Sequence, residues 1–137
     1  MPVEKIHLTL AFLGELDPAA RARALQCAST IHAGSFDLEL DRAGSFRRAR
    51  VAWAGISRAP AALLDLQRDL AERLRAAGIV LEERAFAPHM TLARKTKRAL
   101  PESGIETIRW AVDAFTLVRS ETGTGRYVVE ERWGLGV

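Results

Sequence analysis

Apolar residues along the chain follow two periodicities, which together predict short strands and two helices. A two-residue alternation, as in Phe36, Leu38 and Leu40, is typical of strands with one buried face. Compact apolar runs bounded by glycine, proline or charged residues also favour strands. We expect strands over residues 5–13, 36–40, 50–56, 86–94, 109–119 and 126–133, a short one near 79–83, and a loop over 95–106.

Helical periodicity covers two longer segments. The first begins with Asp17 as N-cap and Pro18 in the first turn, and runs to about His32. The second runs from Pro60 to about Gly78. Leucines at steps of three, four and four form its apolar stripe: Leu63, Leu66, Leu70 and Leu74.

The predicted order of elements is strand, helix, two strands, helix and three strands. Each half contains one helix with strands around it, and no linker divides the 137 residues. We therefore expect one domain over residues 1–137, with an α+β fold of two similar lobes and an active-site groove between them.

A four-residue pattern, His-x-Thr-x, occurs once in each half. It reads His7-Leu8-Thr9-Leu10 in one strand and His89-Met90-Thr91-Leu92 in another, and it contains two of the three histidines. Residues two apart in a strand share a face, so each copy presents an imidazole beside a hydroxyl. Two such strands in contact would line a cleft with two bases and two hydroxyl donors.

These side chains suit the cleavage of a phosphate ester. A nucleophile must lose a proton, a leaving oxygen must gain one, and the phosphoryl oxygens need donors. Imidazole titrates near neutrality, so one histidine can act as base and the other as acid. A lone His-x-Thr in a strand is more often structural, but two copies in matching contexts favour function.

Other catalytic chemistries lack their residues in this sequence. Cys27 is the only cysteine, which excludes an intrachain disulfide and a cysteine-based zinc site. Two histidines without further ligands at metal-binding spacing make an incomplete metal site. Neither a G-x-S-x-G element nor a Walker or G-x-G-x-x-G loop is present. We expect no metal and no cofactor.

The charge balance is mildly basic, with a formal net charge of +3. Such a bias suits a small or short anionic substrate better than high-affinity binding of long nucleic acids. Arginine supplies 17 of the 20 basic residues, either for phosphate contact or through codon usage. The sequence has no signal-peptide pattern and no membrane-length apolar run, so we expect a cytoplasmic protein.

Two segments carry a resemblance to a known family: KIHLTLAFLGEL at residues 5–16 and FAPHMTLAR at 86–94. Segments 46–53, 115–122 and 126–129 support it. Over nearly all of its length the chain resembles the two-histidine (2H) phosphoesterases, and among them the bacterial RNA 2′,3′-cyclic phosphodiesterases, also called 2′-5′ RNA ligases.

The resemblance implies an activity. The family opens RNA 2′,3′-cyclic phosphates to 2′-phosphates with water and no metal, and some members reversibly join RNA ends through a 2′-5′ bond. The matching residues are His7, Thr9, His89 and Thr91, with His7 expected to protonate the O3′ leaving group and His89 to activate water. Alternatives are a 2H phosphoesterase acting on ADP-ribose cyclic phosphate or oligonucleotide 3′ ends, and a non-catalytic module that binds nucleotides or RNA ends.

Three further features acquire candidate roles from their position near the two patterns. Arg94 matches a frequent family arginine, and we expect it to bind phosphate; the alternative is a surface residue. Phe12, five residues after His7, is expected to stack on a nucleobase, although strict alternation puts it opposite His7 and makes a core role the alternative. The basic residues of segment 47–50 either steer RNA or form a solvated loop.

One departure from the family concerns the first pattern. Family members usually carry a strand and a helix before it, whereas only six residues precede His7 here. This predicts an uncovered sheet edge in one lobe, through which two copies could pair as a homodimer.

Overall fold

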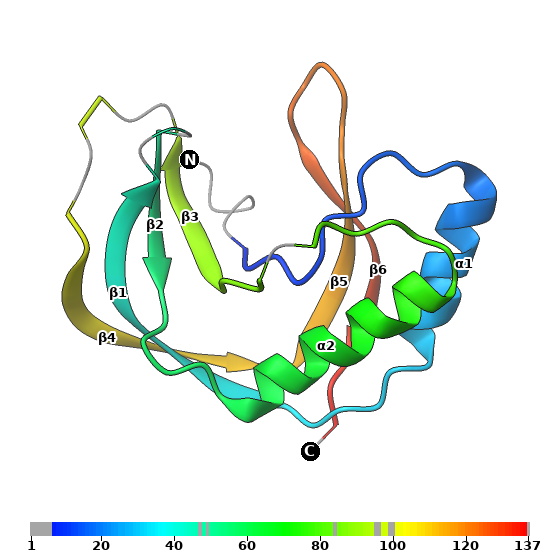
Figure 1. The fold of residues 1–137 in the computed structure, drawn as a ribbon, viewed down its shortest axis with the longest axis horizontal. Helices are drawn as coiled ribbons and strands as arrows, with labels where there is room; N and C mark the ends of the chain where they lie inside the picture. The colour runs from blue at the N-terminus through cyan, green and yellow to red at the C-terminus, as the bar shows by residue number, and fades with distance from the viewer. Residues whose placement is uncertain are drawn as a thin grey trace.

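Two antiparallel sheets and two helices make up the described part of the chain (Figure 1). The computed structural model describes residues 7–46, 48, 50–83, 85–94, 97–98 and 101–136, with the side chains of 93 and 94 excepted. In chain order the elements are α1 (Pro18–Ser29), β1 (Phe36–Phe46), β2 (Val51–Gly55), α2 (Ala61–Ala76), β3 (His89–Arg94), β4 (Ser103–Val112), β5 (Ala114–Ser120) and β6 (Tyr127–Gly134).

The two sheets differ in size, which corrects the prediction of two similar lobes. One sheet has four strands in the order β3-β2-β1-β4, and the other consists of β5 and β6. Neighbouring strands are antiparallel throughout both sheets. The α+β class is confirmed, but the halves are not structural copies of one another.

Both predicted helices form, and local capping sets their ends. The Asp17 side chain accepts a hydrogen bond from the amide of Ala20 at 2.7 Å, as an N-cap should. Helix α1 ends earlier than predicted, with Thr30 as its C-cap. The predicted leucine stripe of α2 is buried along its whole length.

No strand forms near residues 79–83, where a short one was predicted. Gly78 takes a positive φ of 86°, and its amide donates to the Arg75 carbonyl. The amide of Ile79 donates to the carbonyl of Leu74, and both of these side chains are buried in the core. These two hydrogen bonds form a Schellman motif, so Gly78 and Ile79 belong to the C-terminal cap of α2 and not to a strand.

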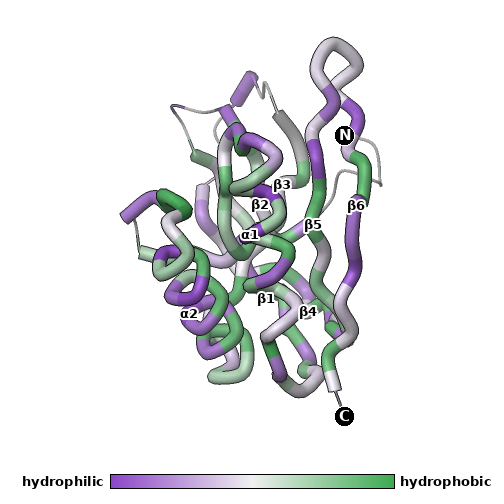
Figure 2. Tube along the Cα trace, turned by 90° about the vertical axis from the view of Figure 1, so that its right-hand side faces the viewer, coloured by the Kyte–Doolittle hydropathy of each residue, from purple (hydrophilic) through white to green (hydrophobic). Residues whose placement is uncertain are grey.

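The main core lies between the helices and the smaller sheet. Small and leucine side chains of α1 and α2 meet Phe115 of β5, which stacks on Trp133 of β6 with ring centroids 5.2 Å apart. Viewed side-on, both helices lie to one side of β5 and β6 (Figure 2). Burying these apolar faces fixes the smaller sheet against the helices.

The strand predicted over 109–119 is divided. Its first part belongs to β4, which begins at Ser103 inside the expected loop, and the rest forms β5. Asp113 lies between them, where the chain leaves β1 and begins to pair with β6. The alternation of side chains continues through this change of partner, so it could not reveal the break.

The prediction of a strand over residues 5–13 is wrong for the part that the structure describes, residues 7–13. Only an isolated bridge, between Leu8 and Met90, joins this segment to a sheet. Leu10, Leu13 and Leu16 pack instead against the helical core. The side-chain amide of Gln67 in α2 also donates to the Leu10 carbonyl at 3.3 Å. The apolar run therefore anchors an extended segment to the helices.

Candidate active site

The second His-x-Thr-x pattern forms the first four of the six residues of β3. His89 pairs with Gly55 and Thr91 with Trp53 across the β2–β3 ladder. Because these positions are two apart, the imidazole and the hydroxyl share one face of the sheet, as predicted. Both side chains are partly exposed.

Trp53 lies against the backbone of this same face. A Cβ atom on Gly44 would come within 2.7 Å of its ring, and one on Gly55 within 2.8 Å. These glycines therefore leave space that the indole fills. Phe46 extends the aromatic surface, with its ring centroid 5.8 Å from Trp53 and 5.1 Å from His89.

One ring nitrogen of His89 has a defined hydrogen bond. Its Nδ1 lies 2.8 Å from the carbonyl oxygen of Ala87. A carbonyl can only accept, so Nδ1 carries the proton. In the neutral imidazole Nε2 is then the basic nitrogen.

The bridge between Leu8 and Met90 brings the first pattern beside the second. It is antiparallel, so one further step in each direction sets His7 opposite Thr91 and Thr9 opposite His89. In Figure 1 the blue segment that contains the first pattern runs between β3 and the β5–β6 hairpin. Leu8 and Met90 share one side of this pairing, which leaves the histidines and threonines to the other.

The His7 ring contacts Tyr127, the first residue of β6. Their ring centroids are 5.1 Å apart with an interplanar angle of 62°, an edge-to-face arrangement. His7 therefore joins the bridge to β3 with a contact to the smaller sheet. Each imidazole packs on one aromatic ring, Tyr127 for His7 and Phe46 for His89.

Sequence reasoning assigned no role to these two aromatic residues. A single Tyr or Phe at a strand end has no periodic signal, and its partner lies far away in the sequence. Their one indication was indirect, because both fall in the segments that carried the family resemblance.

A bulge in β6 ties the smaller sheet to α1 near Tyr127. The register shifts between Leu117 and Val118, which leaves Glu130 as the extra residue of β6. Its carboxylate accepts hydrogen bonds from Arg21 of α1 and Arg119 of β5, both at 2.8 Å. These bonds, that from Arg21 first, hold the pKa of Glu130 below its ordinary value.

Arg94 is the last residue of β3 and pairs with Val51. The β2–β3 register shifts between Ala52 and Trp53, so β3 has one extra residue between Thr91 and Ala93. Strict alternation would put a residue five beyond His89 on the opposite face. Because of this extra residue, position 94 pairs with Val51, and positions 91 and 89 pair with Trp53 and Gly55, the next alternate residues of β2.

Phe12 is 72% exposed, so the alternative core role that strict alternation suggested is wrong. Residue 12 lies outside any strand, and the alternation on which that expectation depended does not apply. Of the basic loop, Arg48 and Arg50 are exposed, whereas Arg47 falls outside the described residues.

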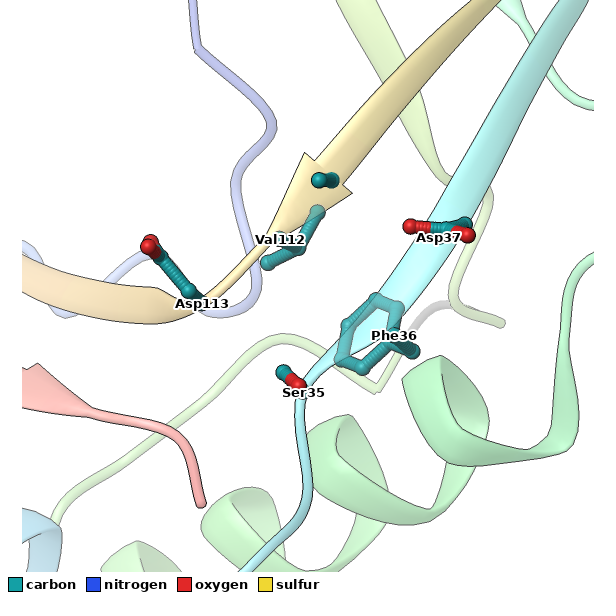
Figure 3. A pocket seen from close by; sticks show the side chains of 6 residues that line it. Ser35, Phe36, Asp37, Val112 and Asp113 are labelled. Carbon is teal, nitrogen blue, oxygen red and sulfur yellow. The ribbon is translucent and has the colours of Figure 1, made fainter. Parts of the chain in front are cut away.

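A cavity of about 260 Å³ lies at the other end of β1, lined by Ser35, Phe36, Asp37, Ala111, Val112 and Asp113 (Figure 3). None of these residues belongs to either His-x-Thr-x pattern. Among the residues that the structure describes, no group of three or more histidine, cysteine or acidic side chains could hold a metal ion. Neither described helix is long and apolar enough to cross a membrane.

The fold and the paired patterns define a class, an α+β protein with two histidine–threonine pairs side by side. A family model described as the 2′-5′ RNA ligase superfamily matches residues 2–124. The RNA 2′,3′-cyclic phosphodiesterase of Escherichia coli K12 is 38% identical over 137 residues, covering 96% of this chain and 77% of its own length.

Solved structures agree with the sequence relatives. A crystal structure of a phosphoesterase aligns with a TM-score of 0.85 and 33% identity, over 100% of this chain and 85% of the other. The E. coli protein LigT in complex with 3′-AMP aligns with a TM-score of 0.83 and 34% identity, over 98% and 84%. The chain belongs to the 2′-5′ RNA ligase superfamily of 2H phosphoesterases and is a homologue of its RNA 2′,3′-cyclic phosphodiesterases.

Proposed function

We propose that this protein hydrolyses RNA 2′,3′-cyclic phosphate ends to 2′-phosphates without a metal ion. The observation that carries the proposal is the antiparallel bridge between Leu8 and Met90, which joins the two His-x-Thr-x patterns. Relatives named RNA 2′,3′-cyclic phosphodiesterase support the same reaction.

In the proposed reaction the two histidines divide the proton transfers. Nε2 of His89 takes a proton from water as the water oxygen bonds to phosphorus. The bond from phosphorus to O3′ breaks, and His7 gives its proton to O3′. The hydrogen bond from His89 Nδ1 to Ala87 supports His89 as the base, because it leaves Nε2 available to accept.

The remaining predicted residues would bind the substrate in the groove proposed between the two sheets. Thr9 and Thr91 would donate to the phosphoryl oxygens, and Arg94 would pair with them as a bidentate donor. The register of position 94 in β3 supports this role. Phe12 would stack on the terminal nucleobase, a role that agrees with its 72% exposure.

A nucleotide ligand is supported by the related LigT structure, which is in complex with 3′-AMP. We further propose that the chain catalyses reversible 2′-5′ ligation of RNA ends. In ligation the 5′-hydroxyl of a second strand would take the place of water. Its oxygen bonds to phosphorus as His89 removes its proton, and the bond from phosphorus to O3′ breaks as His7 protonates O3′.

The direct test is turnover of a nucleoside 2′,3′-cyclic phosphate in excess EDTA, with the product identified by phosphorus NMR. The proposal predicts full activity and a 2′-phosphate product. Loss of activity that added divalent metal restores would contradict the metal-independent mechanism.

The same assay separates the alternatives. Preference for ADP-ribose 1″,2″-cyclic phosphate or for removal of oligonucleotide 3′ ends would indicate another branch of the 2H phosphoesterases. Nucleotide binding without product after long incubation would indicate a binding module.

A second copy of the chain is the proposed partner for the sheet edge. Strand β4 is the last strand of the larger sheet, and Ile108 on it is 55% exposed. Edge strands of this kind can pair with another chain. Light scattering at high protein concentration should detect a dimer, and a monomer throughout would count against it.

A further inference from the structure

One buried polar atom has no role in the proposed mechanism. The indole nitrogen Nε1 of Trp53 is buried, and within the part of the chain that the structure describes it has no hydrogen-bond acceptor. Buried N–H groups of native proteins nearly always have an acceptor, because an unpaired one destabilises the fold. The position of this donor, beside the candidate site, points to a ligand atom as its acceptor.

Trp53 shares one face of the larger sheet with the second His-x-Thr-x pattern. Its Cα partners are Gly44 of β1 and Thr91 of β3. A Cβ atom on Gly44 would lie 2.7 Å from Cζ2 and 3.1 Å from Cε2 of the indole. Because Nε1 is bonded to Cε2, the donor lies on the β1 side of the ring, away from Thr91.

This donor is distant from the proposed position of the phosphate. The catalytic groups belong to β3 and to the segment that the Leu8–Met90 bridge holds beside it. Strand β2 lies between β3 and β1 (Figure 1). Neighbouring strands are ~4.8 Å apart, so roughly 10 Å separates the backbone of β3 from that of β1. A phosphoryl group bound between the two patterns is therefore out of reach of Trp53, and another part of the substrate must supply the acceptor.

The ring of Phe46 packs against both Trp53 and His89. Its centroid lies 5.8 Å from that of Trp53 and 5.1 Å from that of His89. Phe46 is 41% exposed, and exposed side chains change rotamer within nanoseconds. Its present position leaves the indole donor unpaired, so little free energy opposes rotation of the ring toward solvent.

We propose that the indole N–H of Trp53 donates a hydrogen bond to a ribose oxygen of the terminal nucleotide once Phe46 has rotated away. The inference depends on the proposed function and adds to it a residue that binds the sugar. The base is assigned to Phe12, in the segment of the first pattern, and the phosphate to the histidines and threonines. The ribose is the remaining part of the nucleotide. It is common to all four nucleotides, so this contact would not select among bases.

The test observes the indole proton of Trp53 in the wild-type protein. The chain has three tryptophans, and nuclear Overhauser contacts with the Phe46 ring identify the indole signal of Trp53. The probes are adenosine 2′-phosphate, uridine 2′-phosphate and inorganic phosphate, none of which contains a cyclic phosphate. Both nucleotides should move the Trp53 indole proton downfield and slow its exchange with solvent. Inorganic phosphate should do neither.

The role of Phe46 is tested in the free protein. Phe46→Ala should speed the exchange of the Trp53 indole proton with solvent, because the ring that packs against the indole is gone. The indole protons of the other two tryptophans serve as internal references. An unchanged exchange rate at Trp53 would overturn the proposed rotation of Phe46.

Two matched variants measure the effect on turnover. Trp53→Phe removes the donor and retains an aromatic ring, and Trp110→Phe makes the same change at a partly buried position of β4, outside both patterns. Trp53→Phe should raise KM for 2′,3′-cyclic AMP roughly 2- to 10-fold, the usual effect of one neutral hydrogen bond. Its kcat should change little, because the bond is made before and during the reaction alike. Trp110→Phe should keep the wild-type KM.

The spectra keep this inference separate from the proposed activity. If the wild type does not turn over 2′,3′-cyclic AMP but both nucleotides shift the indole proton, the proposed function fails and the sugar contact stands. If turnover occurs and neither nucleotide shifts the indole proton, the inference is overturned and the proposed function stands. A shift with inorganic phosphate, or with only one of the two nucleotides, would place the acceptor on the phosphate or on the base and overturn its assignment to the ribose.

Discussion

The two His-x-Thr-x patterns have the same residues but different structural supports. The second belongs to β3, where ladder pairing to β2 fixes His89 and Thr91. The first lies outside the named strands and meets β3 at the single bridge from Leu8. Side-chain contacts hold the first pattern in place. The leucines of its segment pack in the helical core, and the His7 ring contacts Tyr127.

This difference shows that a repeated sequence pattern need not repeat a secondary structure. What the two copies share is the extended backbone that sets a histidine and a threonine on one side. The backbone hydrogen bonds of a ladder hold one copy, and packing of apolar side chains holds the other. We therefore expect the second pattern to be sensitive to changes within the larger sheet, and the first to changes in the smaller one.

The largest effects should come from the histidines themselves. His7→Ala and His89→Ala should each reduce kcat by roughly 10²–10⁴-fold, the usual contribution of one acid or base. A base must be deprotonated, so His89→Ala should remove the rise of activity at low pH. An acid must be protonated, so His7→Ala should remove the decline at high pH. If His89→Ala instead removed the decline at high pH, and His7→Ala the rise at low pH, the assigned roles would be reversed.

Overpacking at Gly44 should destabilise the support of the second pattern. A Cβ at this position would lie 2.7 Å from the Trp53 ring. Gly44→Ala should therefore lower the free energy of unfolding by about 1–3 kcal/mol, as measured by urea denaturation. Gly134→Ala is the matched control, because a Cβ there meets no atom within 4 Å. Equal stability of the two variants would show that Trp53 moves at little cost.

The two aromatic residues that contact the histidines, Tyr127 and Phe46, should differ in their effect on activity. Removing an edge-to-face contact costs ~0.5–1.5 kcal/mol. Tyr127→Ala should reduce kcat/KM more than Phe46→Ala, because His89 is also held by its ladder and by Ala87. Tyr127→Phe retains the ring and separates its packing from the hydroxyl. A greater loss with Phe46→Ala would contradict the proposed difference between the supports.

The smallest effect should come from Glu130, which ties the smaller sheet to α1. Its pKa is lowered in the native state, so its contribution to stability is present above the pKa of glutamate in the unfolded chain. That contribution is lost as pH falls through the lowered native value. The difference in stability between wild type and Glu130→Gln should therefore shrink on acidification. Glu131→Gln, at an exposed neighbour, should show no such trend.

The helices were predictable because their signals are local. Asp17 and Pro18 mark the start of α1, and the leucine stripe marks the buried face of α2. The prediction for segment 5–13 failed over its described part because an apolar run is the same whether its side chains meet a sheet or a helix pair. The division at Asp113 was hidden because a change of pairing partner leaves the alternation intact.

The candidate site was predictable as far as its repeated pattern reached. The four histidine and threonine positions could be named from their spacing. The contact with Tyr127 and the β3 bulge before Arg94 depend on residues distant in sequence, so no local pattern encodes them. The exposure of Phe12 likewise followed from the absence of a strand, not from the composition of the segment.

The central claim is that both patterns form one catalytic site, and a double-mutant cycle tests it most directly. Turnover of 2′,3′-cyclic AMP in excess EDTA would be compared among wild type, His7→Ala, His89→Ala and the double variant. Groups that act in one step are not additive, so the double variant should be about as slow as the slower single variant. A double variant as active as wild type, or one whose loss is the product of the two single losses, would contradict the claim.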